Sequence, residues 1–174
     1  ISVLTFSARV IWSSEISAFH SALSWFHKSR LANGDVTLEK LCRVFEADLF
    51  SQQVDEDVRF KEGDDDMKLA VMGREMLSLY FRQPIRSVKG SEVPFTVPLA
   101  DPATGREVGI NLEGYFDLVE ADDTIVEFKT SASVMSAFDI HTMLQLSAYG
   151  YAFLALYRKH PKGFKVMNFI KYKK

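Results

Sequence analysis

Two carboxylates and a lysine lie on neighbouring stretches of sequence that alternate apolar and polar residues. Asp117 belongs to Gly-Tyr-Phe-Asp-Leu-Val, and Glu127 and Lys129 belong to Ile-Val-Glu-Phe-Lys-Thr. Side chains on a strand alternate between faces, so Glu127 and Lys129 point the same way. Two close carboxylates repel each other unless a cation lies between them, and Mg²⁺ prefers oxygen ligands. With a lysine alongside to hold a water or a phosphate, this set suits hydrolysis of a phosphodiester bond.

Burial predicts how the two strands pair. If Asp117 lies opposite Glu127, the apolar neighbours form two facing pairs, which are Phe116 with Phe128 and Leu118 with Val126. One face is then wholly apolar and the other collects the charged groups, whereas a slip of one residue would mix charges with the core. The pairing requires the three-residue loop 121–123, a common hairpin length. For Asp-x₉-Glu-x-Lys taken alone, an ordinary cross-strand salt bridge is the alternative interpretation.

Helices and strands with clear periodicity surround this hairpin. Apolar spacing at Ile16, Phe19, Leu23 and Phe26 predicts a first helix over 14–30, capped by Ser13 or Ser14 and ended at Asn33-Gly34. The further expected helices are 37–53, capped by Thr37 or Asp35, then 67–81 and a long apolar helix 137–160. The expected strands are 88–99, 107–120, 124–130 and 164–172. The acid-rich stretch 55–66 is expected to be a solvated loop.

Polar residues recur on the expected helix 137–160. His141, Gln145 and Tyr149 follow one another at one helical turn, so they lie on one line. A polar stripe within a strongly apolar helix needs hydrogen-bonding partners. The alternative is a polar helix face directed toward solvent.

Taken together, these motifs resemble a known enzyme family. Gly-Tyr-Phe-Asp, then Glu-Phe-Lys-Thr, then Gln145-x-x-x-Tyr149 is similar to the RecB-type signature of the PD-(D/E)xK nuclease superfamily, from about His20 to the C-terminus. The proline of the superfamily name is replaced by Phe116. The resemblance implies an α/β, restriction-endonuclease-like core, α-β-β-β-α-β, with a central mixed sheet flanked by helices and an N-terminal helical segment. We expect one domain over 1–174, helical over 1–66 and catalytic over 67–174.

The resemblance also implies roles for individual residues. Asp117 and Glu127 would bind Mg²⁺ or Mn²⁺, the backbone carbonyl of Phe128 would be a further ligand, and Lys129 would be the catalytic lysine. Relatives of the RecB type carry a metal-binding histidine on an N-terminal helix. His20 matches it best, and His27, two turns later, is the competing candidate.

Residues around the acids are candidates for DNA contact. Gln145 and Tyr149 match the family motif that organises the site and touches DNA, and His141 extends their line. Hydroxyl donors to phosphate are expected from Thr130, Ser131 and Ser133. Glu92 and Glu113 are additional acids near the sheet; assistance at the site is one interpretation of either residue, and a solvated strand residue is the favoured one. The lysines toward the C-terminus serve either DNA binding or solubility, and they are Lys159, Lys162, Lys165, Lys171, Lys173 and Lys174.

Composition narrows the function classes. The chain has 174 residues and a formal charge of −2, so nucleic-acid binding must come from a local basic patch. The single cysteine, Cys42, excludes a disulfide framework, a zinc knuckle or a cysteine-ligated iron–sulfur cluster within this chain. The sequence has no run of about 18 apolar residues and no visible signal peptide, so we expect a cytoplasmic protein away from the membrane.

The expected activity is a Mg²⁺- or Mn²⁺-dependent deoxyribonuclease. An exonuclease in recombination, repair or phage DNA metabolism is the favoured form, with a helicase or recombination protein as a conceivable partner. A non-catalytic nucleic-acid-binding module of the same fold and a dimeric endonuclease are the alternatives. An unrelated α/β enzyme with a coincidental Glu-x-Lys is less favoured, because no phosphate-binding glycine loop or nucleophile motif is present. The sequence leaves the oligomeric state open.

Overall fold

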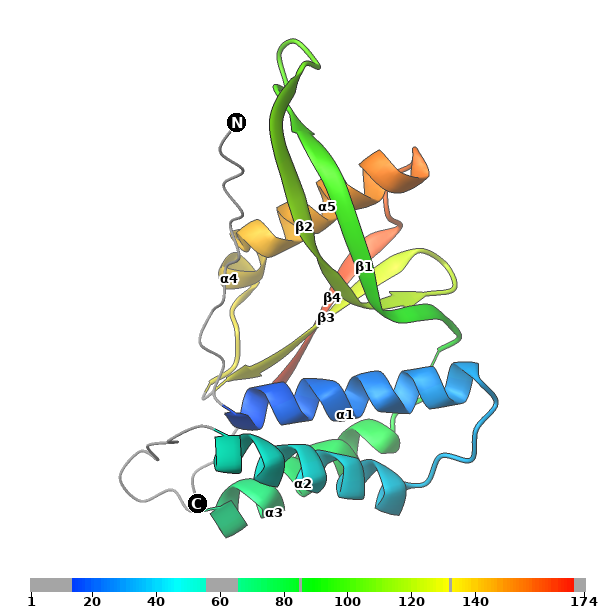
Figure 1. The fold of residues 1–174 in the computed structure, drawn as a ribbon, viewed down its shortest axis with the longest axis vertical. Coiled ribbons are helices and arrows are strands. Elements are labelled where there is room, and N and C mark those ends of the chain that lie inside the picture. Colours follow the sequence, from blue (N-terminus) through cyan, green and yellow to red (C-terminus); the bar gives the residue numbers. More distant parts are fainter. Residues whose placement is uncertain (1–13, 56–65, 85, 132, 171–174) are drawn as a thin grey trace.

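The computed structural model describes residues 14–55, 66–84, 86–131 and 133–170, apart from the side chains of 14–16, 52–55 and 66. Within these ranges the elements follow the chain as shown in Figure 1: α1 (Ser14–Leu31), α2 (Leu38–Asp55), α3 (Asp66–Phe81), β1 (Val88–Ala100), β2 (Glu107–Glu120), β3 (Thr124–Ser131), α4 (Ala137–His141), α5 (Leu144–Tyr157) and β4 (Gly163–Ile170). In these ranges no helix is both long and apolar enough to cross a bilayer.

The described strands form a mixed sheet in the order β1-β2-β3-β4. β1 pairs antiparallel with β2, and β2 pairs antiparallel with β3. β4 runs parallel to β3 along all eight residues of β3, which requires a crossover, and α4 and α5 supply it. From α3 onward the order is the predicted α-β-β-β-α-β, with α4 and α5 in the place of one helix, so the restriction-endonuclease-like fold prediction is confirmed.

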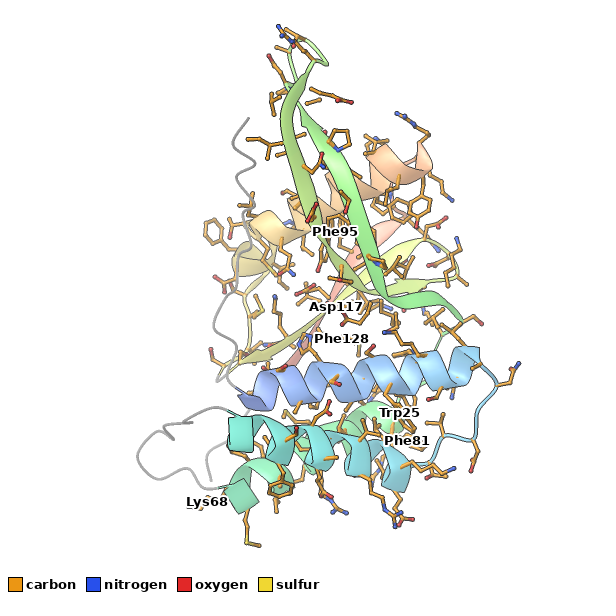
Figure 2. All side chains as sticks on the ribbon, viewed as in Figure 1. Trp25, Lys68, Phe81, Phe95, Asp117 and Phe128 are labelled. Carbon is orange, nitrogen blue, oxygen red and sulfur yellow. The ribbon has the colours of Figure 1, made fainter. Side chains whose placement is uncertain are left out.

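Helices cover both faces of the sheet (Figure 1). On one side α1, α2 and α3 enclose an apolar core in which Phe19, Phe26 and Leu41 meet Val126 and Phe128 of the sheet. On the other side α5 packs through a second apolar core, built around Phe95, Phe116, Ile125 and Phe153. Figure 2 labels Phe128 of the first core and Phe95 of the second. The N-terminal helices therefore share a core with the strands that carry the predicted acids.

A left-handed residue and a side-chain cap mark the end of α1 and the start of α2, close to the predicted positions. Asn33 adopts a left-handed conformation with φ 55°, and it ends α1. The hydroxyl of Thr37 accepts the N–H of Lys40 at 3.2 Å, which caps α2. Ser13, residues 56–65 of the expected acidic loop and residues 171–174 of the expected last strand lie outside the described residues.

The prediction of a single helix over 137–160 is wrong. α4 ends at His141, and the hydroxyl of the capping residue Thr142 donates to the carbonyl of Phe138 at 2.9 Å, a hydrogen bond that often bends helices. Met143 then takes an extended conformation with φ −65° and ψ 109° before α5 begins. His141 therefore belongs to a different helix from Gln145, and the predicted line of three polar residues is broken.

Candidate active site

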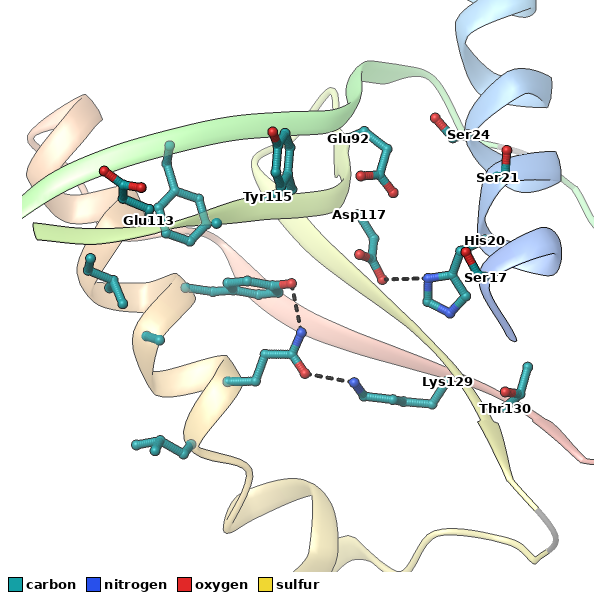
Figure 3. Close-up of a pocket in the computed structure, with 17 residues that line it drawn as sticks. Ser17, His20, Ser21, Ser24, Glu92, Glu113, Tyr115, Asp117, Lys129 and Thr130 are labelled. Atoms are coloured by element: carbon teal, nitrogen blue, oxygen red, sulfur yellow. Dashed lines mark hydrogen bonds and ion pairs between the residues drawn. The ribbon is translucent and has the colours of Figure 1, made fainter. Parts of the chain in front are cut away.

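A cleft of about 1180 Å³ opens between α1, the β1–β2 hairpin, β3 and the start of α5 (Figure 3). Asp117 and Lys129 both line this cleft, as does His20 from α1. Glu127 has none of its surface exposed and lies behind the lining residues. The structure thus brings the predicted acid, lysine and histidine to one concave surface, although the second acid is buried beneath it.

The strands β2 and β3 separate where Asp117 is placed. Their pairing consists of Leu118 with Val126 and Val119 with Ile125. Extended by one residue, this register places Asp117 opposite Glu127, as predicted. The two residues are not paired, however, because the ladder between the described strands stops at Leu118 and Val126. Instead, the N–H of Phe128 donates to Oδ2 of Asp117 at 2.8 Å. A carboxylate therefore occupies the position of a main-chain carbonyl in the ladder.

This separation overturns one prediction about the apolar face. Phe116 packs on the α5 side, with its ring centroid 5.2 Å from that of Tyr149 and 6.0 Å from that of Phe153. Phe128 packs on the opposite side against Tyr80, at 5.7 Å. The prediction that Phe116 and Phe128 face each other is therefore wrong. The divergence of the strands beyond Leu118 sends the two rings into different cores.

Glu127 and Lys129 form the polar centre of the site. Nζ of Lys129 lies 2.5 Å from Oε1 of Glu127 and donates to Oε1 of Gln145 at 2.7 Å. Nε2 of Gln145 in turn donates to the hydroxyl of Tyr149 at 2.9 Å. Gln145 and Tyr149 therefore share one helix face, as predicted, and Gln145 fixes where the lysine ammonium lies.

Burial of the acids makes their negative charge unfavourable. Burial, followed by the charge of Glu127, raises the pKa of Asp117 to about 8, and the N–H of Phe128 only partly opposes this. Burial and the charge of Glu127 also raise the pKa of Tyr149 well above its ordinary value. Burial is the larger cause of both shifts, and the charge of Glu127 adds to it; a cation bound beside the acids would favour their ionised forms.

Of the two candidate histidines, the geometry favours His20. Its Nδ1 lies 3.9 Å from Oδ2 of Asp117, and both side chains are 12% exposed. Burial, together with the charge of Lys129, lowers the pKa of His20 to about 4, so the ring is neutral at pH 7, the form that binds metals. His27 is fully buried, with Nε2 2.5 Å from the hydroxyl of Tyr80, and it does not line the cleft.

The residues at the cleft fit a divalent cation by their chemistry. An imidazole and a carboxylate already lie close together in His20 and Asp117. The N–H and C=O of a strand residue point to the same side, so the Phe128 carbonyl also faces toward Asp117. Oε1 of Glu127 pairs with the ammonium of Lys129, and Oε2 of Glu127 is buried without a hydrogen-bond partner among the described residues. In this part of the chain no three acidic, histidine or cysteine side chains converge, since Glu127 is turned to Lys129.

The other predicted contact residues are placed unequally. Thr130 lines the cleft, and its buried Oγ1 has no hydrogen-bond partner within the described ranges. The hydroxyl of Ser131 instead bonds to the carbonyl of Ser133 at 2.5 Å and to the side chain of Asn168 at 2.8 Å. His141 is exposed on α4, outside the cleft lining.

The lysines toward the C-terminus form ion pairs that neither the DNA-binding nor the solubility interpretation predicted. Their described members bridge to acids at and before the turn between β2 and β3, and the pairs are Lys159 with Asp123, Lys162 with Asp122, and Lys165 with Glu120. These ion pairs fasten the start of β4 to that turn. Lys171, Lys173 and Lys174 lie outside the described residues.

Several residues that line the cleft were not among the predicted site residues, and for Glu92 and Glu113 a solvated position was the favoured interpretation. Glu92 lies opposite Asp117 in the register of β1 and β2, and it is half-buried rather than solvated. Burial raises the pKa of Glu92, and its backbone has φ 50°, an unusual conformation for this residue type. Glu113 and Tyr115 also line the cleft, as do three serines of α1 at helical spacing around His20: Ser17, Ser21 and Ser24. Their spacing relative to His20 was the available signal.

Comparison with known proteins gives one match. The model of the PD-(D/E)XK nuclease superfamily matches residues 17–172, a range that contains all the residues lining the cleft. None of the curated proteins matches the chain.

Proposed function

The chain belongs to the PD-(D/E)XK nuclease superfamily, and on that premise we propose that it is a DNA exonuclease of the RecB-like branch. Members of the superfamily are usually phosphodiester hydrolases and generally use divalent metals such as Mg²⁺. The observation that carries the proposal is the convergence of Asp117 and Lys129 on one cleft, with Glu127 directly beneath.

His20, Asp117, Glu127 and the backbone carbonyl of Phe128 are the proposed ligands of Mg²⁺ or Mn²⁺. A bound cation supplies a Lewis acid for the phosphate oxygens and lowers the pKa of a water. Asp117 and His20 support this assignment by their 3.9 Å approach, and Glu127 by its buried carboxylate. Turning Glu127 away from Lys129 toward Asp117 is the side-chain change that completes the set.

Lys129 is the proposed catalytic residue. Its ammonium donates a hydrogen bond to a phosphate oxygen or to the attacking water, which stabilises the negative charge that grows during hydrolysis. Gln145 holds the ammonium at 2.7 Å, and Tyr149 holds Gln145 at 2.9 Å, so these two residues act as positioning residues. The hydroxyl of Thr130 offers a further donor at the cleft wall.

The proposal includes the exonuclease assignment, a role in recombination or repair, a cytoplasmic location and association with a helicase. Their support is the combined signature of Gly-Tyr-Phe-Asp, Glu-Phe-Lys-Thr and Gln145-x-x-x-Tyr149. We also propose that residues 1–174 act as one nuclease domain, because the N-terminal helices provide His20 and share a core with β3.

Digestion of labelled DNA with and without Mg²⁺ or Mn²⁺ tests the function. End-labelled linear DNA should be degraded only with metal, and covalently closed circular DNA should remain intact. Lys129→Ala and Glu127→Gln should reduce cleavage by at least about a hundredfold, whereas Lys40→Ala, which removes an exposed lysine paired with Asp35, should not.

Each contrary result has a distinct meaning. Cutting of the circle would identify an endonuclease, and metal-dependent binding without cleavage would identify a non-catalytic module. Wild-type cleavage by a folded Lys129→Ala protein would show that the catalytic assignment is wrong. Cooperative thermal unfolding of both variants is required, because removing Lys129 leaves Glu127 buried without its ion pair.

A further inference from the structure

Tyr115 is an exposed aromatic side chain inside the cleft. It lies on β2, lines the cleft, and has 57% of its surface exposed. Figure 3 shows its ring on the strand that carries Asp117. An aromatic ring with this exposure buries little apolar surface in the fold, so its stability contribution does not account for its position.

The position of Tyr115 relative to Asp117 is fixed by the strand. The two residues are two positions apart, so they lie on the same face, about 7 Å apart along the chain. This spacing is comparable to the reach of one extended nucleotide. A phosphate held beside Asp117 therefore places a neighbouring base within reach of the tyrosine ring.

The walls of the cleft differ in chemistry. On one side α1 contributes the exposed hydroxyl groups of Ser17 and Ser21, and β3 contributes the ammonium of Lys129. These groups match a sugar–phosphate backbone, because hydroxyl and ammonium groups donate to phosphate oxygens. Tyr115 on β2 and Leu144, which is 82% exposed at the start of α5, supply apolar surface to the same cleft.

We propose that Tyr115 is a base-stacking platform, and that the cleft consequently takes an unpaired DNA strand rather than an intact duplex. The inference rests on the proposed function and names its substrate class. In a duplex the faces of internal bases are covered by their neighbours, so a protein ring can stack only on an unpaired or terminal base. Stacking tolerates every base because each has a π-face, so the platform adds affinity without sequence preference.

Binding measured in EDTA separates this role from catalysis. The probes are a fluorescein-labelled oligothymidylate, the same strand with a single 2-aminopurine, and a short blunt duplex. Tyr115→Leu should weaken binding of the single strand by about 5- to 150-fold and should abolish quenching of the 2-aminopurine. Tyr115→Phe keeps the ring and should behave like the wild type. Phe138→Leu is the matched control, because Phe138 is 75% exposed but lies outside the cleft lining.

Each outcome of these binding measurements either supports or overturns the stacking role of Tyr115. Selective loss of single-strand binding by Tyr115→Leu, with Phe138→Leu unchanged, supports the platform. Unchanged binding by Tyr115→Leu, an equal loss for single strand and duplex, or an absence of quenching by the wild type overturns it. A parallel cleavage assay with Mg²⁺ isolates the proposed function: a protein that stacks the base but never cleaves refutes the nuclease activity and leaves the role of Tyr115 standing.

Discussion

Asp117 on β2 accepts the main-chain N–H of Phe128 on β3 at 2.8 Å, while its carboxylate also faces the cleft. The same side chain thus connects two strands at the point where their ladder stops. An asparagine at this position can still accept the N–H, because its side-chain carbonyl is also an acceptor. Structural and chemical roles of Asp117 can therefore be separated by one substitution.

Asp117→Asn should stabilise the metal-free protein at alkaline pH. The folded pKa of Asp117, about 8, is above the unfolded value of about 3.9. Stability is then greatest, as far as this group is concerned, below the unfolded pKa and falls as pH rises through about 8. In EDTA at pH 8 the variant should exceed the wild type by on the order of 1 kcal/mol or more, with a smaller difference at pH 5. Urea unfolding at both pH values measures this.

Added Mg²⁺ provides the counter-test. At pH 8 the ion should raise the unfolding midpoint of the wild type by binding only the folded state, and it should raise that of Asp117→Asn much less. A variant that is less stable than the wild type at both pH values would contradict the assigned pKa direction. Equal stabilisation of both proteins by Mg²⁺ would remove Asp117 from the ligand set.

Gln145→Ala should slow cleavage about 10- to 100-fold, with a larger effect on kcat than on KM, because it releases the ammonium of Lys129 and leaves the proposed metal ligands in place. Tyr149→Phe removes only the hydroxyl that holds Gln145 and should have a smaller effect. Single-turnover kinetics of both variants and of the double variant measure the coupling. Additive losses would mean that the two residues do not act as one hydrogen-bonded chain.

His27→Gln should make the protein less sensitive to acid. Burial, and then the charge of Arg30, lowers the pKa of His27 to about 4, compared with about 6.5 when unfolded. Its contribution to stability is fully present above pH 6.5 and is lost as pH falls through about 4. Between these pH values the wild type should lose about 1–3 kcal/mol more than the variant. His20 has the same direction of shift, so the slope of stability against pH should decrease rather than vanish. An unchanged slope in urea unfolding would contradict the shift.

Gly73→Ala should destabilise the N-terminal helices, although alanine favours a helix. A Cβ at this position would lie 2.1 Å from Cζ of Phe45 on α2, so the ring must move. Overpacking of this kind costs about 1–3 kcal/mol, more than the gain of about 1 kcal/mol in helix propensity. Gly163→Ala is the control, because nothing lies within 4 Å of its added Cβ. Urea midpoints compare the two, and equal values would mean that α2 and α3 pack more loosely than described.

Periodicity predicted most of the fold because burial imposes it. The apolar spacing around Phe19 and Phe26 predicted the bounds of α1 closely, and the alternation of apolar and polar residues near Val126 predicted β3. The break between α4 and α5 was not predicted because the apolar pattern continues across it, whereas the hydrogen bond from Thr142 to Phe138 and the extended backbone of Met143 leave no period in the sequence. Partners of long lysine side chains, such as Lys162 and Asp122, are set by tertiary structure and leave no sequence period.

The sequence predicted those parts of the candidate site in which the residues share one face of a single strand or helix. Alternation placed Glu127 with Lys129, and the helical turn placed Gln145 with Tyr149. A solvated position was favoured for Glu92 because its neighbours alternate as in an ordinary half-buried strand, and its left-handed backbone cannot be read from residue types. The separation of Phe116 from Phe128 was missed for a related reason, since register alone does not state how far a ladder extends.

The limited pairing between β2 and β3 has a mechanical consequence. β3 is fastened to β4 along its whole length, whereas the β1–β2 hairpin joins β3 through Leu118 and Val119 and projects beyond α5 (Figure 1). Asp117 therefore lies at the end of the short β2–β3 ladder, whereas Glu127 lies on the strand that β4 holds along its length. Farther along the hairpin, the hydroxyl of Tyr151 on α5 donates to the carbonyl of Pro98 at 2.6 Å and accepts the N–H of Ala100 at 3.0 Å, so the spacing of the two acids is set by how the hairpin packs on its neighbours as well as by the sheet.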